Sequence, residues 1–232
     1  MEWVVFSVAV LVAGWWVHRR RSRPDSVFAH LRLEAAKTFT IPPNNLELMQ
    51  RIQQVLDSKS PLWLASPRPV QITNRLVLSG FYSATDHQLA QLRQEFGISG
   101  VVNLAHGDVL DGQRAHRHQA AGMAYLGLAA RDETGYDIMQ HWDEVSKFAQ
   151  SHERVLVHCM AGVNRSAALV VALVCRETQR DLVEAVRLVQ TKRGPILTNQ
   201  SFQSRLVTWW QRTPSQNAVF EPSRIVQPEL PE

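Results

Sequence analysis

A stretch in the second half of the chain, VLVHCMAGVNRSAALVVALV from Val155 to Val174, places the strongest constraint on the fold. The apolar residues up to Val157 have the length of a buried strand, and the apolar run after Arg165 has the length of a helix. A His-Cys pair and a short loop of small and polar residues separate the two runs. The pattern therefore predicts a buried strand, a functional loop and a central buried helix in immediate succession.

From Gln71 onward, short apolar segments alternate with longer amphipathic segments. We expect strands over residues 75–80, 99–105, 123–129 and 154–158. We expect helices over 85–97, 166–178, 181–193 and 199–212, and within 106–122 and 134–152. This alternation indicates an α/β fold with a mainly parallel central sheet flanked by helices.

Several helix ends can be placed from their capping residues. Thr85 or Asp86 is the candidate N-cap of the first of these helices, and Gly97 is a typical residue for its end. Asp181 and Glu184 have the spacing of a capping box at the start of the 181–193 helix.

The composition changes along the chain predict four segments. These are a transmembrane anchor with a basic flank (1–23), a connecting arm (24–70), the α/β domain (71–212) and a disordered tail (213–232). Within the arm, Asn45 is the expected N-cap of a helix over 45–56, which we expect to serve in packing. The apolar residues with helical spacing there are Leu46, Met49, Ile52, Val55 and Leu56.

The N-terminal segment has an uncharged run from Trp3 to Val17, followed by Arg19, Arg20, Arg21 and Arg23. Tryptophans near the ends of the run and the basic flank favour a single membrane span with the rest of the chain in the cytosol. The run is short, which suits the endoplasmic reticulum or the mitochondrial outer membrane. The alternative is an amphipathic or buried N-terminal helix.

The net charge of +4 is concentrated in the same segment. Residues 1–23 hold four Arg and one Glu, which leaves 21 basic and 20 acidic residues in the rest of the chain. This distribution argues against a nucleic-acid partner.

Cysteine and histidine usage predicts neither a disulfide framework nor a metal site. The chain has two cysteines, and Cys175 lies in an apolar helical run typical of a buried residue. His106, His116 and His118 lack the spacing of metal ligands, and we expect them on a solvated face. We therefore expect no cofactor.

The loop after the 154–158 strand combines groups that suit phosphate chemistry. Successive backbone N–H groups at the start of a helix form a cradle for an anion, and Gly162 permits the tight backbone path. Such a loop also favours the thiolate form of Cys159. Arg165 can bind two oxygens of a phosphate, and Ser166 is placed to donate a hydrogen bond to the Cys159 sulfur.

Residues 158–166, HCMAGVNRS, resemble the motif of the cysteine-dependent protein tyrosine phosphatases, H-C-x-x-G-x-x-R followed by Ser or Thr. The resemblance is closest to the dual-specificity branch, where AGV-x-RSA precedes a hydrophobic helix. It extends over residues 70–212, through ITNRLVLSGFYSA, GISGVVNLA and RGPILTNQSFQSRL. Two positions depart from the family pattern, because Asn164 stands where many members have Ser and Thr198 stands where Pro is common.

The resemblance implies a mechanism in which Cys159 attacks phosphorus and forms a cysteinyl-phosphate. Ser166 would ease departure of the thiolate, and His158 would orient the loop. The loop residues that would bind the phosphate are Met160, Ala161, Gly162, Val163, Asn164 and Arg165.

The family also uses an aspartate as general acid, from a loop after a sheet strand. LAARDETGYD offers Asp132, Glu133 and Asp137, and Asp132 follows the strand most directly. Asp132 could instead cap the following helix. Asn103, at the end of its own strand, fits either a hydrogen bond near the active loop or a turn.

The sequence thus predicts a membrane-anchored dual-specificity phosphatase whose partner is a phosphorylated protein. The uncharged side chains of Met160, Ala161 and Val163 favour a phosphoprotein over a highly anionic lipid, although lipid, glycan and nucleotide phosphates stay open. Two alternative functions from other classes are a pseudophosphatase that binds phosphorylated partners and a rhodanese-like sulfur carrier. The sequence does not predict an oligomeric state.

Overall fold

The computed structural model describes residues 45–58, 68–82, 85–108 and 113–213. The strands are β1 (Val70–Gln71), β2 (Leu76–Ser79), β3 (Gly100–Asn103), β4 (Ala124–Gly127) and β5 (Val155–His158). The helices are α3 (Leu46–Asp57), α4 (Asp86–Phe96), α5 (Arg114–Ala120), α6 (Trp142–Gln150), α7 (Arg165–Thr178), α8 (Leu182–Arg193) and α9 (Gln200–Arg212), and a short 3₁₀ helix, η2 (Ile138–His141), leads into α6. Every strand and helix expected from residue 75 to residue 212 is present.

The strands form one sheet in the order β1-β2-β5-β3-β4. β2, β5, β3 and β4 run parallel, and β1 pairs antiparallel with β2 at the edge. The expectation of a mainly parallel sheet is therefore confirmed, while β1 was not predicted. A strand of two residues is too short to show an alternating pattern, and prolines such as Pro67 and Pro69 beside it disfavour regular structure.

The register brings the carboxyl ends of the three central parallel strands to one edge of the sheet. His158, the last residue of β5, lies between Ser79 of β2 and Asn103 of β3. Ligands of parallel α/β sheets bind at this edge, beyond the ends of the strands. Cys159 is the next residue after His158, so the fold places it there.

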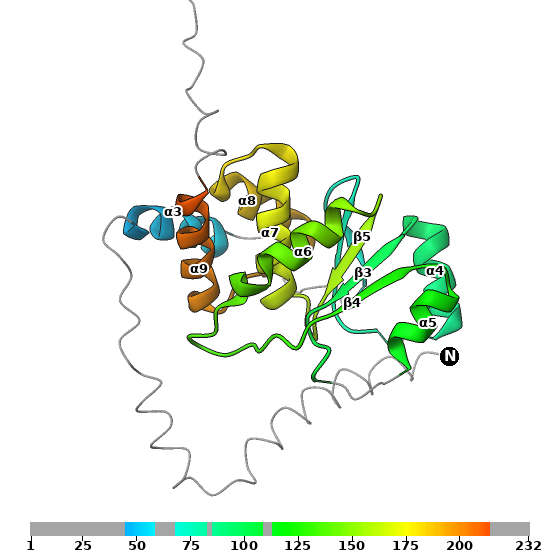
Figure 1. The fold of residues 1–232 in the computed structure, drawn as a ribbon. Helices are drawn as coiled ribbons and strands as arrows, with labels where there is room; N and C mark the ends of the chain where they lie inside the picture. The colour runs from blue at the N-terminus through cyan, green and yellow to red at the C-terminus, as the bar shows by residue number, and fades with distance from the viewer. Residues whose placement is uncertain (1–44, 59–67, 83–84, 109–112, 214–232) are drawn as a thin grey trace, which may run out of the picture. The chain divides into compact units, whose positions relative to one another are not determined.

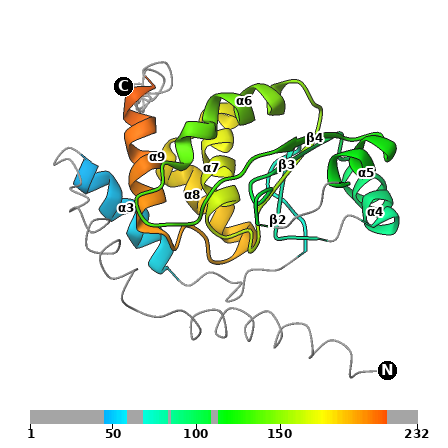
Figure 2. The same ribbon diagram turned by 60° about the horizontal axis from the view of Figure 1, so that its bottom comes forward.

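Helices cover both faces of the sheet (Figures 1 and 2). α4 and α5 lie on one face, and α3 and α6 to α9 lie on the other. Alternate strand residues enter the two cores, as Leu156 packs with the α4 side while Val155 and Val157 pack with the α7 side. α7 is buried from Arg165 to Cys175, as its uniformly apolar sequence predicts.

Capping residues set the helix ends largely as expected. The Thr85 side chain accepts a hydrogen bond from the Gln88 N–H at the start of α4, and Gly97 ends that helix in the left-handed conformation. At the start of α8, the Asp181 side chain accepts a hydrogen bond from the Glu184 N–H.

The arm contains the expected helix, α3, and it belongs to the same compact unit as the sheet. Met49, Ile52 and Val55 are buried in the main core, where α3 packs against α8 and α9. The folded unit therefore extends to the N-terminal side of the predicted boundary at residue 71. Asn45 occupies the N-cap position, but its side chain does not cap the helix, and its amide nitrogen donates to Thr208 Oγ1 at 3.3 Å.

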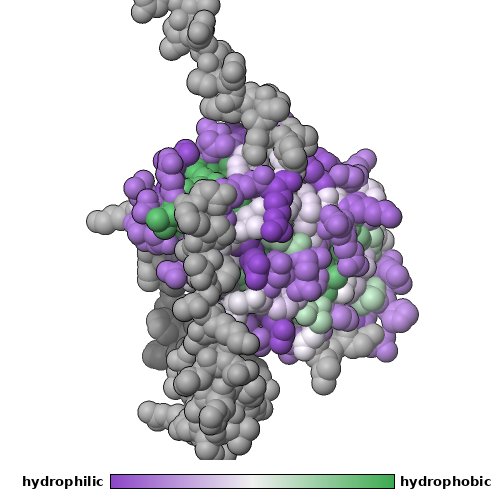
Figure 3. Space-filling view, turned by 60° about the vertical axis from the view of Figure 1, so that its left-hand side comes forward, coloured by the Kyte–Doolittle hydropathy of each residue, from purple (hydrophilic) through white to green (hydrophobic). Residues whose placement is uncertain are grey.

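No helix in the described part of the chain is long and apolar enough to cross a membrane. The predicted anchor (1–23) lies outside the described residues, as do the first part of the arm and the tail from residue 214. The face shown in Figure 3 is mostly hydrophilic, with small hydrophobic areas between polar side chains.

Candidate active site

The loop from Cys159 to Asn164 joins the end of β5 to the start of α7, and Cys159 lies at its base with 1% of its surface exposed. The Cys159 sulfur accepts a hydrogen bond from the Gly162 N–H at 3.3 Å and one from the Ser166 hydroxyl at 3.2 Å. The predicted contact between Ser166 and the sulfur is therefore present. Both donors stabilise a negative charge on the sulfur.

The loop carbonyls point away from the sulfur, and other parts of the fold hold them. Phe81 N–H donates to the Met160 carbonyl at 2.9 Å, and Leu197 N–H donates to the Val163 carbonyl at 2.8 Å. Because a peptide's C=O and N–H point in opposite directions, outward carbonyls turn the following N–H groups inward. The Gly162 N–H, which donates to the Cys159 sulfur, has this inward direction, and the arrangement suits an anion cradle.

Arg193, at the end of α8, holds the middle of the loop. Its Nε donates to the Gly162 carbonyl at 3.2 Å and its Nη2 to the Ala161 carbonyl at 3.1 Å, while Nη1 donates to the Arg68 carbonyl. The side chain is fully buried, and this burial lowers the pKa of Arg193 to about 10, so it stays charged at neutral pH. Sequence reasoning did not identify this residue.

Arg165 presents one edge of its guanidinium to the cradle. Its Nη1 donates to Asp108 Oδ2 at 2.7 Å, to the Ala130 carbonyl at 2.9 Å and to the Leu104 carbonyl at 3.4 Å. Its Nε is buried and has no partner among the residues that the structure describes. The Nε and Nη2 edge is therefore the one that can bind two phosphate oxygens, as the bidentate geometry requires.

Asp132 lies at the rim of the loop, with both carboxylate oxygens in hydrogen bonds. Asn164 Nδ2 donates to Oδ2 at 3.2 Å, and Asn199 Nδ2 donates to Oδ1 at 3.1 Å. The other two candidate acids make contacts elsewhere, since Glu133 pairs with Arg131 and Asp137 caps η2 through the Met139 N–H. Among the described contacts, Asp132 alone of the three candidates bonds to the loop from Cys159 to Asn164, hereafter the phosphate loop.

The family model of the dual specificity phosphatase catalytic domain matches residues 81–212, more than half of the chain. The chain belongs to this family. The match ends with α9, and it includes the phosphate loop, Asp132 and Arg193.

Curated proteins of similar sequence include dual specificity protein phosphatases. Dual specificity protein phosphatase 26 of Bos taurus is 33% identical over 130 residues, which are 53% of this chain and 60% of that protein. Dual specificity protein phosphatase 13B of Mus musculus is 32% identical over 142 residues, 59% of this chain and 69% of that protein. The chain thus spans about 60% of the length of dual specificity protein phosphatase 26.

Solved structures share the fold at lower identity. The crystal structure of human DUSP28 superposes with a TM-score of 0.52 at 24% identity, covering 66% of this chain and 98% of that chain. PTPMT1 in complex with PI(5)P superposes with a TM-score of 0.56 at 18% identity, covering 64% of this chain and 98% of that chain.

In this dual specificity phosphatase domain, His158 is fully buried behind the loop. Burial and, to a smaller extent, the positive charge of Arg114 lower the pKa of His158 to about 3, so the ring is neutral. Its ring lies 4.9 Å from the ring of Tyr82, centroid to centroid, and its Nδ1 lies 3.4 Å from the Cys159 carbonyl oxygen. This setting fits the predicted role of orienting the loop.

The prediction that the three histidines share a solvated face was wrong for His118. His106 and His116 are exposed, but His118 is fully buried, and its Nε2 lies 2.8 Å from the Tyr82 hydroxyl. A buried imidazole needs such a partner, and this one comes from a segment far away in sequence. Asn103 has the role of a turn residue, because its Oδ1 accepts from the Ala105 N–H.

The described residues contain no cluster of His, Cys, Asp and Glu that could hold a metal ion.

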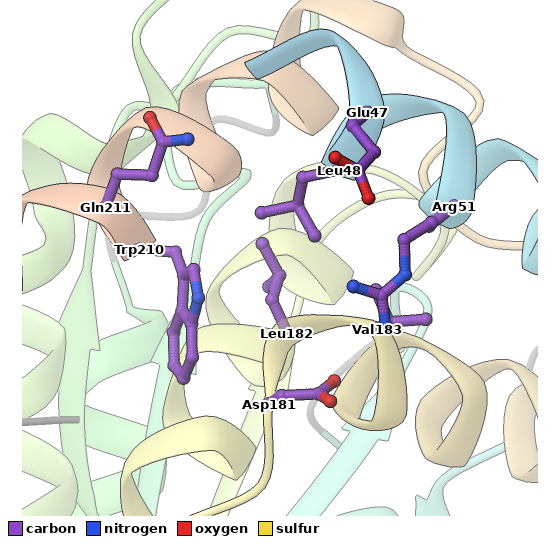
Figure 4. Close-up of a pocket in the computed structure, with 8 residues that line it drawn as sticks. All are labelled: Glu47, Leu48, Arg51, Asp181, Leu182, Val183, Trp210 and Gln211. Carbon is purple, nitrogen blue, oxygen red and sulfur yellow. The ribbon is translucent and has the colours of Figure 1, made fainter. Parts of the chain in front are cut away.

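A surface pocket of about 320 Å³ lies between α3, the start of α8 and the end of α9, where Leu48, Leu182 and Trp210 contribute to its wall (Figure 4). The end of α8 contacts the phosphate loop through Arg193, and the helix is 12 residues long. The pocket therefore lies about 18 Å along α8 from the candidate site, at 1.5 Å per residue.

Proposed function

We propose that this chain is a protein phosphatase that hydrolyses phosphotyrosine and phosphoserine or phosphothreonine through a cysteinyl-phosphate intermediate. The observation that carries the proposal is the convergence on one loop of the Cys159 sulfur, the inward N–H groups and the open edge of Arg165. These groups match the nucleophile and the three equatorial oxygens of a transferring phosphoryl group.

In the first step the Cys159 thiolate attacks phosphorus, and the bond from phosphorus to the ester oxygen breaks. Asp132 donates a proton to the leaving oxygen, and the loop N–H groups with Arg165 bind the oxygens of the transferring group. In the second step water attacks the cysteinyl-phosphate, Asp132 accepts a proton from that water, and the bond between sulfur and phosphorus breaks. Ser166 donates to the departing sulfur, and the product is inorganic phosphate.

Hydrolysis of p-nitrophenyl phosphate by the full chain tests this mechanism. We expect Cys159→Ser to abolish turnover and Asp132→Ala to reduce it by about a hundredfold or more. Cys175→Ala and Asp143→Ala are matched controls, since Cys175 is buried in α7 and Asp143 is exposed on α6, and both should stay active. A folded wild-type chain that binds orthovanadate without turning over substrate would support the pseudophosphatase instead. Persulfide formation on Cys159 would support the sulfur carrier.

The proposed substrate class follows from the side chains of the loop. Met160, Ala161 and Val163 carry no charge, and Met160 is 39% exposed at the rim. A highly anionic lipid headgroup would find no cationic side chain at these positions. PTPMT1, which was crystallised with PI(5)P, shares the fold, so a phosphoinositide is the appropriate substrate to compare with phosphopeptides. We expect faster phosphate release from phosphotyrosyl and phosphothreonyl peptides than from PI(5)P in vesicles, and the reverse order would contradict the assignment.

We also propose that residues 1–23 anchor the protein in a membrane with the phosphatase domain in the cytosol. The uncharged run from Trp3 to Val17 and the arginines that follow it support this proposal. Deletion of residues 1–23 should move the protein from the membrane to the soluble fraction, whereas deletion of residues 214–232 should not. Imaging of the tagged full chain then distinguishes the endoplasmic reticulum from the mitochondrial outer membrane. Membrane association that persists after the first deletion would contradict the anchor.

A further inference from the structure

Asn164, the last residue of the phosphate loop, joins three segments of the chain through one side chain. Its Nδ2 donates to Asp132 Oδ2 at 3.2 Å. Its Oδ1 accepts from Thr198 Oγ1 and from the Asn199 N–H, each at 3.1 Å. Asn164 occupies the N-cap position of α7, but its side chain does not cap that helix. The amide is therefore committed to the contact between the loop, the candidate acid and the connection from α8 to α9.

The orientation of the Asn164 amide is determined by its partners. A backbone N–H can only donate, so the Asn164 atom that faces the Asn199 N–H must be the oxygen. The amide nitrogen then faces Asp132, where a carboxylate can only be bonded by a donor. Thr198 adds a second donor to the same oxygen.

Asp132 depends on these contacts because its side chain is exposed. An exposed carboxyl group on a loop samples several rotamers, and fixing one of them costs conformational entropy. The amides of Asn164 and Asn199 hold one carboxylate oxygen each. Asn199 also donates to the Glu133 carbonyl at 3.3 Å, which holds the backbone beside the acid.

We propose that Asn164 is a positioning residue that orients the Asp132 carboxyl over the phosphate loop, with Thr198 fixing the orientation of the Asn164 amide. The inference rests on the proposed function, since it assigns Asp132 as general acid. The two departures from the family pattern, Asn164 and Thr198, are in direct contact. A serine at position 164 would present one oxygen on a shorter side chain, whereas the asparagine amide carries its donor and its acceptor on separate atoms.

The test compares leaving groups, because a poor leaving group needs a proton from the acid and a good one does not. We would measure kcat/KM of the full chain on phenyl phosphate and on 2,4-dinitrophenyl phosphate. Asn164→Ala should lower kcat/KM about tenfold or more on the first substrate and less than about twofold on the second. In an Asp132→Ala background the same substitution should have no further effect. Thr198→Val should also lower kcat/KM on phenyl phosphate more than on 2,4-dinitrophenyl phosphate, but by a smaller factor than Asn164→Ala.

A structural role of Asn164 in the loop would give a different result. It would lower kcat/KM equally on both substrates, weaken inhibition by inorganic phosphate and persist in the Asp132→Ala background, and this outcome would overturn the proposal. Asn74→Ala is the matched control, because Asn74 is exposed in the connection from β1 to β2. It should match the wild type on both substrates.

A wild-type chain that hydrolyses neither substrate would contradict the proposed function, but the contact can still be tested. Asn164→Ala, Asp132→Ala and the double variant would be compared by urea denaturation. Non-additive shifts of the unfolding midpoint would support the contact, and additive shifts would overturn it.

Discussion

At the scale of single residues, Gly162 shows why one loop position excludes every side chain. Its φ of +68° lies in the left-handed region. A Cβ at this position would lie 2.5 Å from the Ser79 carbonyl oxygen and would also meet Nη2 of Arg193. Arg193 holds the loop carbonyls, and Ser79 is backbone of β2 paired with His158, so neither can move without disturbing the loop.

We therefore expect Gly162→Ala to destabilise the fold by about 2 to 4 kcal/mol, from backbone strain and crowding together. Turnover of p-nitrophenyl phosphate should be lost as well. Gly135→Ala is the matched control, because Gly135 has a φ of +85° and a Cβ there would have no neighbour within 4 Å in the described part of the chain. It should cost only the strain, about 1 kcal/mol, in urea denaturation. Equal costs for the two variants would contradict this reasoning.

His158 predicts a pH dependence of stability. Its pKa is about 3 in the folded protein and about 6.5 when unfolded, so between these values the unfolded state binds one proton more. The free energy of unfolding should therefore fall as pH falls through this window, by up to about 1.4 kcal/mol per pH unit from this residue. The contribution is fully present above pH 6.5.

Urea denaturation of the wild type and of His158→Asn between pH 5 and pH 7 measures this slope. The variant should lose the part of the slope that belongs to His158, whatever its stability at neutral pH. His141, whose pKa is lowered mainly by burial, adds to the slope in both proteins. The difference between the slopes of the wild type and the variant therefore reports on His158 alone. Identical slopes would show that His158 is not buried in the neutral form.

At the scale of elements, the end of α8 supports the phosphate loop through Arg193. The guanidinium satisfies carbonyl groups from two loop residues and from Arg68. A single ammonium group cannot reach all of these positions, because it lacks the planar arrangement of donors.

Arg193→Met should lower kcat/KM by about a hundredfold and stability by about 3 kcal/mol, since it leaves buried carbonyls without donors. Arg193→Lys should be intermediate in both respects. Arg187→Met, on the exposed side of the same helix, controls for the loss of an arginine and should be close to the wild type. Steady-state kinetics and urea denaturation measure the two effects, and a fully active Arg193→Met protein would exclude this supporting role.

The elements were largely predictable because periodicity and caps are local signals. Strands β2 to β5, helix α7 and the Asp181 cap follow from neighbouring residues alone. Asp108 and Arg193 were missed because their roles depend on contacts with residues 57 and 31 positions away. The burial of His118 was missed for the same reason, since its partner Tyr82 lies 36 positions away.

At the scale of the whole molecule, α3 is part of the fold although it precedes the family match at residue 81. Ile52 of α3 is fully buried, whereas Leu46 on the same helix is 50% exposed. Ile52→Ala should therefore cost about 2 to 5 kcal/mol, and Leu46→Ala should change stability by less than about 0.5 kcal/mol. Urea denaturation of the full chain measures both. A negligible cost for Ile52→Ala would show that α3 is dispensable for the domain.

The chain has two cysteines, and they lie at opposite ends of α7. Arg165 begins the helix beside Cys159, and Cys175 is ten residues further on, about 15 Å at 1.5 Å per residue. A disulfide needs Cα atoms within about 7 Å, so Cys175 cannot resolve an oxidised Cys159. A sulfenic acid formed at Cys159 would therefore depend on an external thiol, such as glutathione, for its reduction. Recovery from oxidative inactivation would follow the supply of cellular reductant rather than any internal exchange.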